Sequence, residues 1–122
     1  MPESWRDLPL GTFNADGLVP NLNDIRINWH VGNLEETIGN LKFVKKREHQ
    51  ALIFFDLDIF APSLIAWNGI SKNLRVGDVL YFDEAFDKDE RMLLNNYILT
   101  FGKFELIAAS WMSLAIKLIE IY

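Results

Sequence analysis

The 122-residue chain contains no cysteine. This absence excludes a disulfide scaffold, thiolate metal sites and cysteine nucleophiles. Its two histidines, His30 and His49, are too far apart to form a ligand pair on one helix face. No apolar run reaches the roughly 20 residues that span a bilayer, and the first residues lack the basic and apolar regions of a signal peptide. We therefore expect a soluble, cytoplasmic protein that has no membrane partner.

Positive charge is also scarce. Twelve lysines and arginines stand against 17 acidic residues, which gives a net charge of −5. A general nucleic-acid binder needs a positive surface that releases counterions from phosphates. The one short basic cluster, residues 42–47, is more typical of a solvated helix face, so we expect no nucleic-acid partner. Half of the residues are apolar, which is enough for the core of one domain.

The N-terminal part of the chain gives weaker signals of secondary structure. Residues 1–24 are predicted to be irregular, because prolines and glycines recur there without apolar periodicity. Residues 25–31 (IRINWHV) alternate between apolar and polar types and so predict a strand. A helix is expected from Leu34 to about Arg47, entered at Asn33, because acidic residues in a first turn suit the helix dipole.

Two short apolar runs follow, over residues 51–55 and 79–82. Their length and lack of alternation are typical of buried strands in a parallel sheet. We expect a helix after the first run, with Pro62 at its first position and an end near Arg75–Gly77.

A second helix is expected after residues 79–82. Asp87 and Glu90 have the spacing of a capping box at its start, and Gly102 is the expected stop after Phe101. Two β-rich runs, joined by a short turn, then predict an antiparallel pair. These runs cover residues 104–111 and 114–122.

The predicted order is therefore β-α-β-α-β-α-β-β. Strands that alternate with helices indicate an α/β fold. We expect a mostly parallel sheet with a C-terminal antiparallel strand pair and helices on both faces.

Four acidic residues stand where the two apolar runs end. Asp56 and Asp58 follow the first run, and Asp83 and Glu84 follow the second. Ligands of open parallel sheets bind outside the carboxyl ends of the strands, and adjacent strands lie only about 4.8 Å apart. Carboxylates at that distance repel one another, and a positive group such as a divalent cation must offset the repulsion. A plainer alternative is that these acids cap the helices that follow, but four of them on two strands favour a site.

The run FFDLDIFAPSLIAWNGISKNLRVGDVLYFDEAFD (residues 54–87) carries a family resemblance. It resembles the strand 4–helix–strand 5 segment of class I S-adenosylmethionine-dependent methyltransferases, in the macrocin O-methyltransferase branch. Shared features are the D-x-D motif, the L-x-x-G turn and the D-E pair. INWHVGNLEETI (residues 27–38) is similar to the strand 3 segment. The resemblance covers about residues 20–122 and identifies residues 25–122 as the C-terminal half of a Rossmann-like sheet with the order 3-2-1-4-5-7-6.

The resemblance implies an S-adenosylmethionine-dependent, Mg²⁺-assisted O-methyltransferase that acts on hydroxyls of a sugar or natural product. By position, Asp56, Asp83 and Glu84 would hold the metal, with Asp56 and Asp83 as the catalytic pair. The metal would orient vicinal hydroxyls and lower the pKa of the attacking one. Asp58 would face the substrate. Gly32 and Asn33 would lie near the cofactor adenine.

The sequence departs from the family pattern in several places. Phe60 replaces a Tyr, Asp78 replaces the second Gly of the turn, and Glu84 replaces the commoner second Asp. The chain has no glycine-rich G-x-G segment and no acidic residue for the ribose. We therefore expect a truncated chain, inactive alone, whose open sheet edges a homo-oligomer would cover.

Two other functions fit parts of the sequence. A haloacid dehalogenase-type phosphatase would use Asp56 as nucleophile and Asp58 as acid/base. The motif of that family has Gly-Thr or similar residues just after the second Asp, where this chain has Ile59 and Phe60. The second alternative is a non-catalytic half-domain that acts in assembly or binding.

Overall fold

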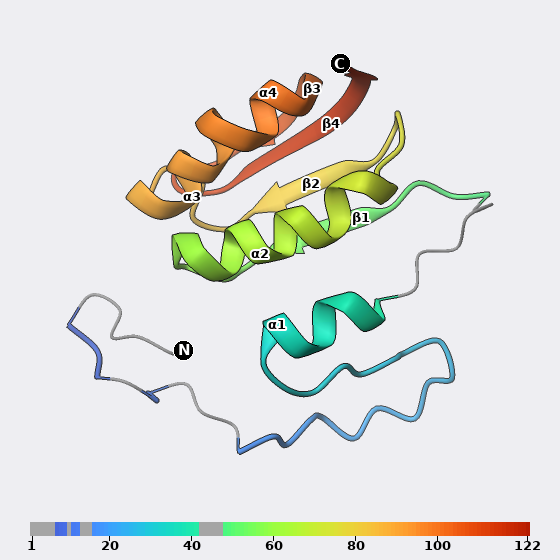
Figure 1. Ribbon diagram of the computed structural model, residues 1–122, viewed down its shortest axis with the longest axis vertical. Coiled ribbons are helices and arrows are strands. Elements are labelled where there is room, and N and C mark those ends of the chain that lie inside the picture. Colours follow the sequence, from blue (N-terminus) through green and yellow to red (C-terminus); the bar gives the residue numbers. More distant parts are fainter. Residues whose placement is uncertain (1–6, 10, 13–15, 42–47) are drawn as a thin grey trace. The chain divides into compact units, whose positions relative to one another are not determined.

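A computed structural model describes residues 7–9, 11–12, 16–41 and 48–122 (Figure 1). The chain divides into two compact units, residues 1–41 and residues 42–122. No helix of the described residues is long and apolar enough to cross a membrane.

The described residues of the first unit contain one short helical segment. Helix α1 (Leu34–Thr37) continues into a 3-10 turn (Ile38–Asn40). Asn33 is the residue before the helix, as predicted, and its carbonyl oxygen accepts the backbone N–H of Thr37 at 3.1 Å. The helical segment ends earlier than predicted, because Leu41 has an extended backbone. Residues 42–47 of the predicted helix lie outside the described residues.

The predicted strand over residues 25–31 is wrong. These residues have no strand structure, and all of them are exposed. The backbone turns at Asp24, whose carbonyl oxygen accepts the N–H of Ile27 and whose carboxylate pairs with the guanidinium of Arg26. An alternating pattern becomes a strand only when a neighbour satisfies its backbone groups and packs on its apolar face. No described residue of this unit belongs to a strand that could do so.

The second unit is built on a four-stranded sheet. The strands are β1 (Leu52–Phe55), β2 (Val79–Phe82), β3 (Gly102–Ala109) and β4 (Leu114–Ile121), in the order β1-β2-β4-β3. The two apolar runs and the C-terminal antiparallel pair are confirmed as strands. The expectation of a mostly parallel sheet is wrong, since only β1 and β2 pair in parallel. A turn of a few residues after β3 forces β4 to run back antiparallel, and β4 then inserts beside β2.

Two helical segments connect the strands. Helix α2 (Phe60–Ile70) ends in a 3-10 turn (Ser71–Asn73). It begins two residues before Pro62, which still lies in the first turn, where a missing N–H costs no helical hydrogen bond. Helix α3 (Lys88–Leu93), a π-helical turn (Leu94–Ile98) and α4 (Leu99–Phe101) form the second connection. Asp87 caps α3 through the backbone N–H of Lys88.

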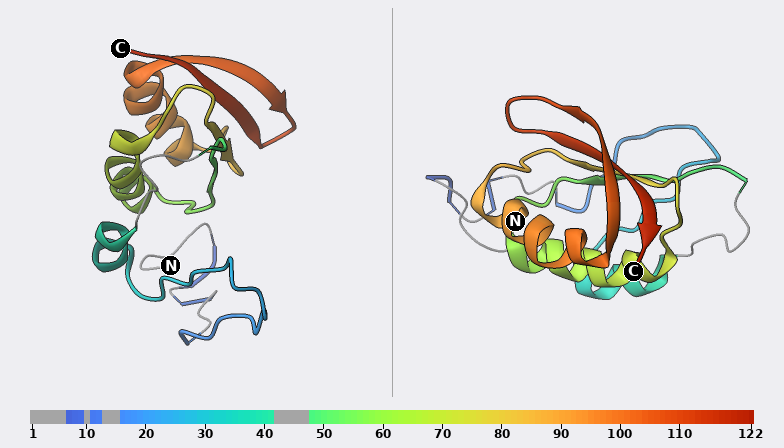
Figure 2. Two further views of the ribbon diagram at one scale, coloured as in Figure 1. Left: turned by 90° about the vertical axis from the view of Figure 1, so that its right-hand side faces the viewer. Right: turned by 90° about the horizontal axis from the view of Figure 1, so that it is seen from above.

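Helices cover one face of this sheet. In Figure 2, α2, α3 and α4 lie together on one side of the strands. The core between them includes Phe55 and Phe82, stacked with ring centroids 4.8 Å apart, and Trp67, which meets Phe101 edge-on. The expectation of helices on both faces is therefore wrong for the described part of this unit. The opposite face carries exposed apolar side chains, among them Leu52 and Phe54.

Gly102 follows the end of the helical stretch at Phe101, as predicted. It is the first residue of β3 and has an extended backbone. A Cβ atom on Gly102 would lie 2.2 Å from the carbonyl oxygen of Glu120. Close contact between β3 and β4, and not backbone conformation, requires glycine there.

Asp78, which replaces the second Gly of the family's turn, has a structural role. Its side chain is 1% exposed, and its two carboxylate oxygens accept the backbone N–H groups of Ala51 at 2.9 Å and of Arg75 at 2.8 Å. Its own carbonyl oxygen accepts the N–H of Leu118 at 2.8 Å. Asp78 therefore joins the start of β1, the turn before β2 and strand β4.

Candidate functional site at the carboxyl edge of β1 and β2

The two acid-bearing strand ends meet at one edge of the sheet, as the sequence predicted. β1 and β2 are parallel neighbours, with Phe55 opposite Phe82. The backbone N–H of Asp83 donates to the carbonyl oxygen of Phe55 at 3.2 Å. Asp56 and Asp83 therefore begin the two loops side by side.

The loop after β1 is tightly turned. Asp56 is exposed. Asp58 has a positive φ of 58°, a conformation that Asp adopts more readily than most residues. The next backbone N–H, from Ile59, donates to the carbonyl oxygen of Leu57 at 2.6 Å. This turn brings the half-buried Asp58 back toward the edge just before α2 begins.

The loop after β2 is held by two hydroxyl groups. Tyr81 Oη donates to Asp83 Oδ1 at 3.0 Å. Ser113 Oγ donates to the Asp83 carbonyl oxygen at 3.1 Å and lies 3.4 Å from Oδ1. Sequence reasoning missed both hydroxyls. Tyr81 could have been found, because alternation places it on the same face of the strand as Asp83. Ser113 could not, since it comes from the β3–β4 turn, 30 residues further along the chain.

Glu90 lies beneath this edge and is the least expected member of the site. Its side chain is 1% exposed. Glu90 Oε2 accepts the backbone N–H of Glu84 at 3.1 Å. In the predicted capping box it would instead accept the backbone N–H of Asp87, at the start of its own helix. Glu90 Oε1 has no hydrogen-bond partner among the described residues.

Burial raises the pKa of Glu90 to about 7. The hydrogen bond from the Glu84 N–H opposes this rise, and the neighbouring negative charges of Asp58, Glu84 and Asp83 add to it. Three of the four predicted acids therefore act electrostatically on one buried carboxyl group. Carboxylate repulsion at this edge therefore acts on Glu90, a residue that the sequence did not place there.

The predicted metal ligands are Asp56, Asp83 and Glu84. Within the described ranges, no group of three His, Cys, Asp or Glu side chains is arranged so that it could hold a metal ion. The magnesium set stays a prediction from the family resemblance.

Gly32 and Asn33, the predicted cofactor-binding residues, belong to the first unit. Gly32 has a φ of 140°. Asn33 has an extended backbone, and its side chain makes no capping hydrogen bond to α1. Their assignment to a cofactor likewise stays a prediction.

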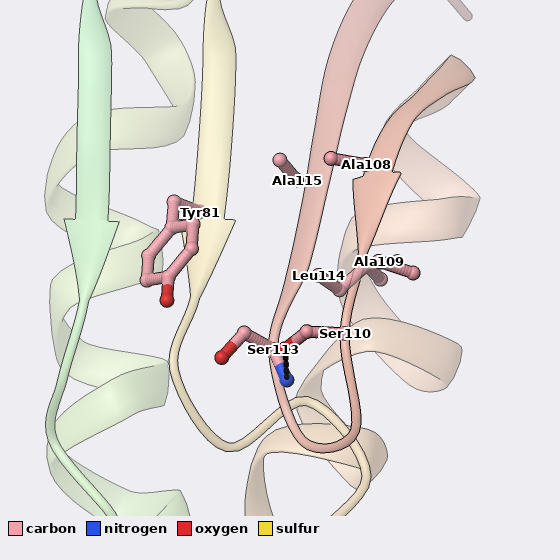
Figure 3. Close-up of a pocket in the computed structure, with 7 residues that line it drawn as sticks. All are labelled: Tyr81, Ala108, Ala109, Ser110, Ser113, Leu114 and Ala115. Atoms are coloured by element: carbon pink, nitrogen blue, oxygen red, sulfur yellow. Dashed lines mark hydrogen bonds between the residues drawn. The ribbon is translucent and has the colours of Figure 1, made fainter.

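A small hollow adjoins the acidic edge on the open face of the sheet (Figure 3). Its volume is about 210 Å³. Tyr81 forms one side, and the end of the β3–β4 hairpin forms the other. Its lining residues are Tyr81, Ala108, Ala109, Ser110, Ser113, Leu114 and Ala115.

No protein-family model, curated protein or solved structure matches this chain.

Proposed function

We propose that the second unit is the acceptor-binding half of an S-adenosylmethionine-dependent O-methyltransferase domain. The acceptor is a small molecule, such as a sugar or natural product, that carries hydroxyl groups. One observation carries the proposal. The sheet order β1-β2-β4-β3 is the order that strands 4, 5, 7 and 6 have in the family that the sequence resembles.

The order is informative because it is not the simplest one. A chain that ends in a hairpin could place β3 next to β2 and leave β4 at the edge. Here β4 inserts between β2 and β3. Sequential strands are neighbours in most sheets, so an inserted last strand supports the resemblance more strongly than the presence of four strands would.

The acidic edge supports the same proposal. Asp83 is fixed by Tyr81 and Ser113, and Glu84 is fixed through its backbone by Glu90. The Asp83 carboxylate, held in this way, accepts a hydrogen bond from an acceptor hydroxyl and holds that hydroxyl at the edge of the sheet. Positioning of this kind supplies much of the rate in group transfer.

Neither the sequence nor the described residues contain a glycine-rich cradle for the cofactor. The proposal therefore assigns the hydroxyl-holding role to these residues and assigns no cofactor contact to them.

The test uses the protein in its native assembly, captured from its own cells through a C-terminal tag. The assembly is incubated with methyl-labelled S-adenosylmethionine, Mg²⁺ and a panel of hydroxyl acceptors. We expect label transfer that is lost in Asp83→Asn and retained in Glu120→Gln, which removes an exposed acid from β4. An assembly that transfers no label and retains no S-adenosylhomocysteine would overturn the proposal.

A second candidate function, assembly through the open edge of the sheet, has its own support. β1 is an edge strand, and its Leu52 and Phe54 side chains are 58% and 65% exposed. An exposed apolar edge strand is a template for pairing with another chain. We propose that a second copy of this chain covers it.

Light scattering over a range of concentrations tests this second candidate. Wild type should form a dimer that Phe54→Asp disrupts, while Phe86→Asp, at a half-exposed phenylalanine outside the strands, leaves it intact. A wild-type chain that stays monomeric at all concentrations would exclude self-assembly.

A further inference from the structure

The open face of the second unit carries a row of side chains whose size changes from one side of the sheet to the other. The row consists of register partners on β1, β2, β4 and β3, namely Phe54, Tyr81, Ala115 and Ala108. Two aromatic rings, with centroids 5.1 Å apart, therefore stand beside two methyl groups. The hollow of about 210 Å³ lies over the alanines, and Figure 3 shows the Tyr81 ring at its side.

Phe54 is a large apolar side chain of this row that stands in water. It is 65% exposed, and Leu52, on the same face of β1, is 58% exposed. Antiparallel pairing of β1 with β1 of a second copy would satisfy the backbone groups of the edge. It would only extend the sheet, however, and both Phe54 rings would stay exposed. Burial of the ring requires a surface that packs on the face of the sheet.

The open face of a second copy provides that surface, because the row is complementary to itself. A two-fold axis that lies between two stacked sheets and runs along the strands reverses the order of the strands in one sheet relative to the other. β1 then lies over β3 of the second copy, and β2 lies over β4. Residues of one row stay at the same level, so Phe54 faces Ala108 and Tyr81 faces Ala115.

This pairing of sizes suits the distance between packed sheets. Two sheets that pack face to face lie about 10 Å apart, with their strands aligned within roughly 30°. A large side chain opposite a small one fills that space, whereas two rings would collide and two methyl groups would leave a void. The hollow over Ala108 and Ala115 is the space that an incoming phenylalanine ring occupies.

The charged residues of this face are compatible with the packing. Lys117 and Glu105 are register partners in the next row of the same face, so neither is buried without an opposite charge beside it. The two-fold axis brings Asp83 of both copies to the same end of the dimer. Salt screens repulsion between exposed charges, so the dimer should become tighter as ionic strength rises, and a dimer that salt weakens would count against this geometry.

We propose that two copies of this chain pack their open sheet faces together, with the Phe54 ring of each copy over Ala108 and Ala115 of the other. The inference rests on the second candidate function, in which a second copy covers Leu52 and Phe54. It places that copy on the face of the sheet and not beside its edge. In the first candidate function the missing half of the methyltransferase domain would take this face, so a chain cannot be in both assemblies at once.

Light scattering of the full chain over a range of concentrations measures the dissociation constant of the dimer. Phe54→Ala removes the ring and should weaken the dimer about tenfold or more. Ala108→Leu fills the hollow from within and should weaken it to a similar extent. Ala61→Leu is the control, at an exposed alanine on α2, and should leave the dimer unchanged. Circular dichroism checks that each variant is folded.

An exchange of sizes tests the complementarity itself. The double variant Phe54→Ala, Ala108→Phe reverses the row, so that each introduced ring again faces an alanine, and the dimer should recover most of its affinity. The double variant Phe54→Ala, Ala61→Phe has the same composition with the ring on α2, and it should stay as weak as Phe54→Ala. Equal affinity of the two double variants would overturn the proposal.

Nuclear Overhauser effects locate the contact in a mixture of ¹³C-labelled and unlabelled chains. We expect effects between the Phe54 ring protons of one copy and the Ala108 methyl group of the other. Within one copy, β1 and β3 are three strand spacings apart, or roughly 14 Å, which is too far for this effect. A dimer without this effect between copies would overturn the proposal.

The outcomes separate this inference from the candidate function on which it rests. A dimer that Phe54→Ala weakens, but that a folded Ala108→Leu chain forms as well as wild type, would overturn face packing and keep assembly through the β1 edge. A wild-type chain that stays monomeric at all concentrations would overturn both.

Discussion

Glu90 Oε2 accepts the backbone N–H of Glu84 at 3.1 Å, and so a buried acid on α3 holds the loop that follows β2. This contact connects the helical layer to the acidic edge. It also puts a carboxyl group where water is excluded and other carboxylates are near. Stability and the geometry of the edge therefore depend on the same side chain.

Glu90 should make the stability of the fold depend on pH. Its pKa is about 7 in the folded chain against an ordinary value of 4.5, so the folded state holds the proton more tightly. The contribution of Glu90 to the free energy of unfolding should therefore be largest below about pH 4.5, fall as the pH rises toward 7, and be lost above it. The total fall due to this group is at most about 3 kcal/mol.

Glu90→Gln should remove this fall and be more stable than wild type above pH 7, because the amide keeps an acceptor for the Glu84 N–H and carries no charge. Urea unfolding at several pH values measures the effect. Glu48→Gln, at an exposed acid, is the control and should follow wild type. A Glu90→Gln curve parallel to that of wild type would refute the assignment.

Asp78 should be among the most important polar residues for stability. Asp78→Ala removes the acceptors of the Ala51 and Arg75 N–H groups, and we expect a loss of about 2–4 kcal/mol. Thermal unfolding followed by circular dichroism gives the value. Glu120→Ala, at an exposed site, should cost less than about 0.5 kcal/mol. Similar losses in the two variants would show that the Asp78 contacts contribute little.

Gly102 should tolerate no side chain. In Gly102→Ala the new methyl group meets the Glu120 carbonyl oxygen, a backbone atom that moves only if β4 moves. We expect a loss of about 3 kcal/mol or more, or a shift in the pairing of β3 and β4. Gly39→Ala is the matched control, because nothing lies within 4 Å of the Cβ position there. Its unfolding midpoint should stay close to wild type, and equal loss in both variants would rule out the contact.

Local pattern predicted much of the second unit. β1 and β2 were found from two short apolar runs that end in acidic residues. The expected cover on both faces was wrong for β1, because Leu52 and Phe54 are exposed. The N-cap at Asp87 and the end of the helical stretch at Phe101 followed from local chemistry. The meeting of Asp56 and Asp83 at one edge followed from parallel pairing alone. Residues 25–31 show the limit of this approach, since their alternation was real and no strand formed.

The sequence by itself determined which segments are strands and helices in the second unit, and that acids end β1 and β2. Those features depend on residues close together in the chain. Only the tertiary structure decided that β4 inserts beside β2, that one sheet face stays open, and that Glu90 and Ser113 join the acidic edge. These features depend on which distant segments pack together, because a hydrogen bond across 30 residues or a hollow over two alanines leaves no local pattern.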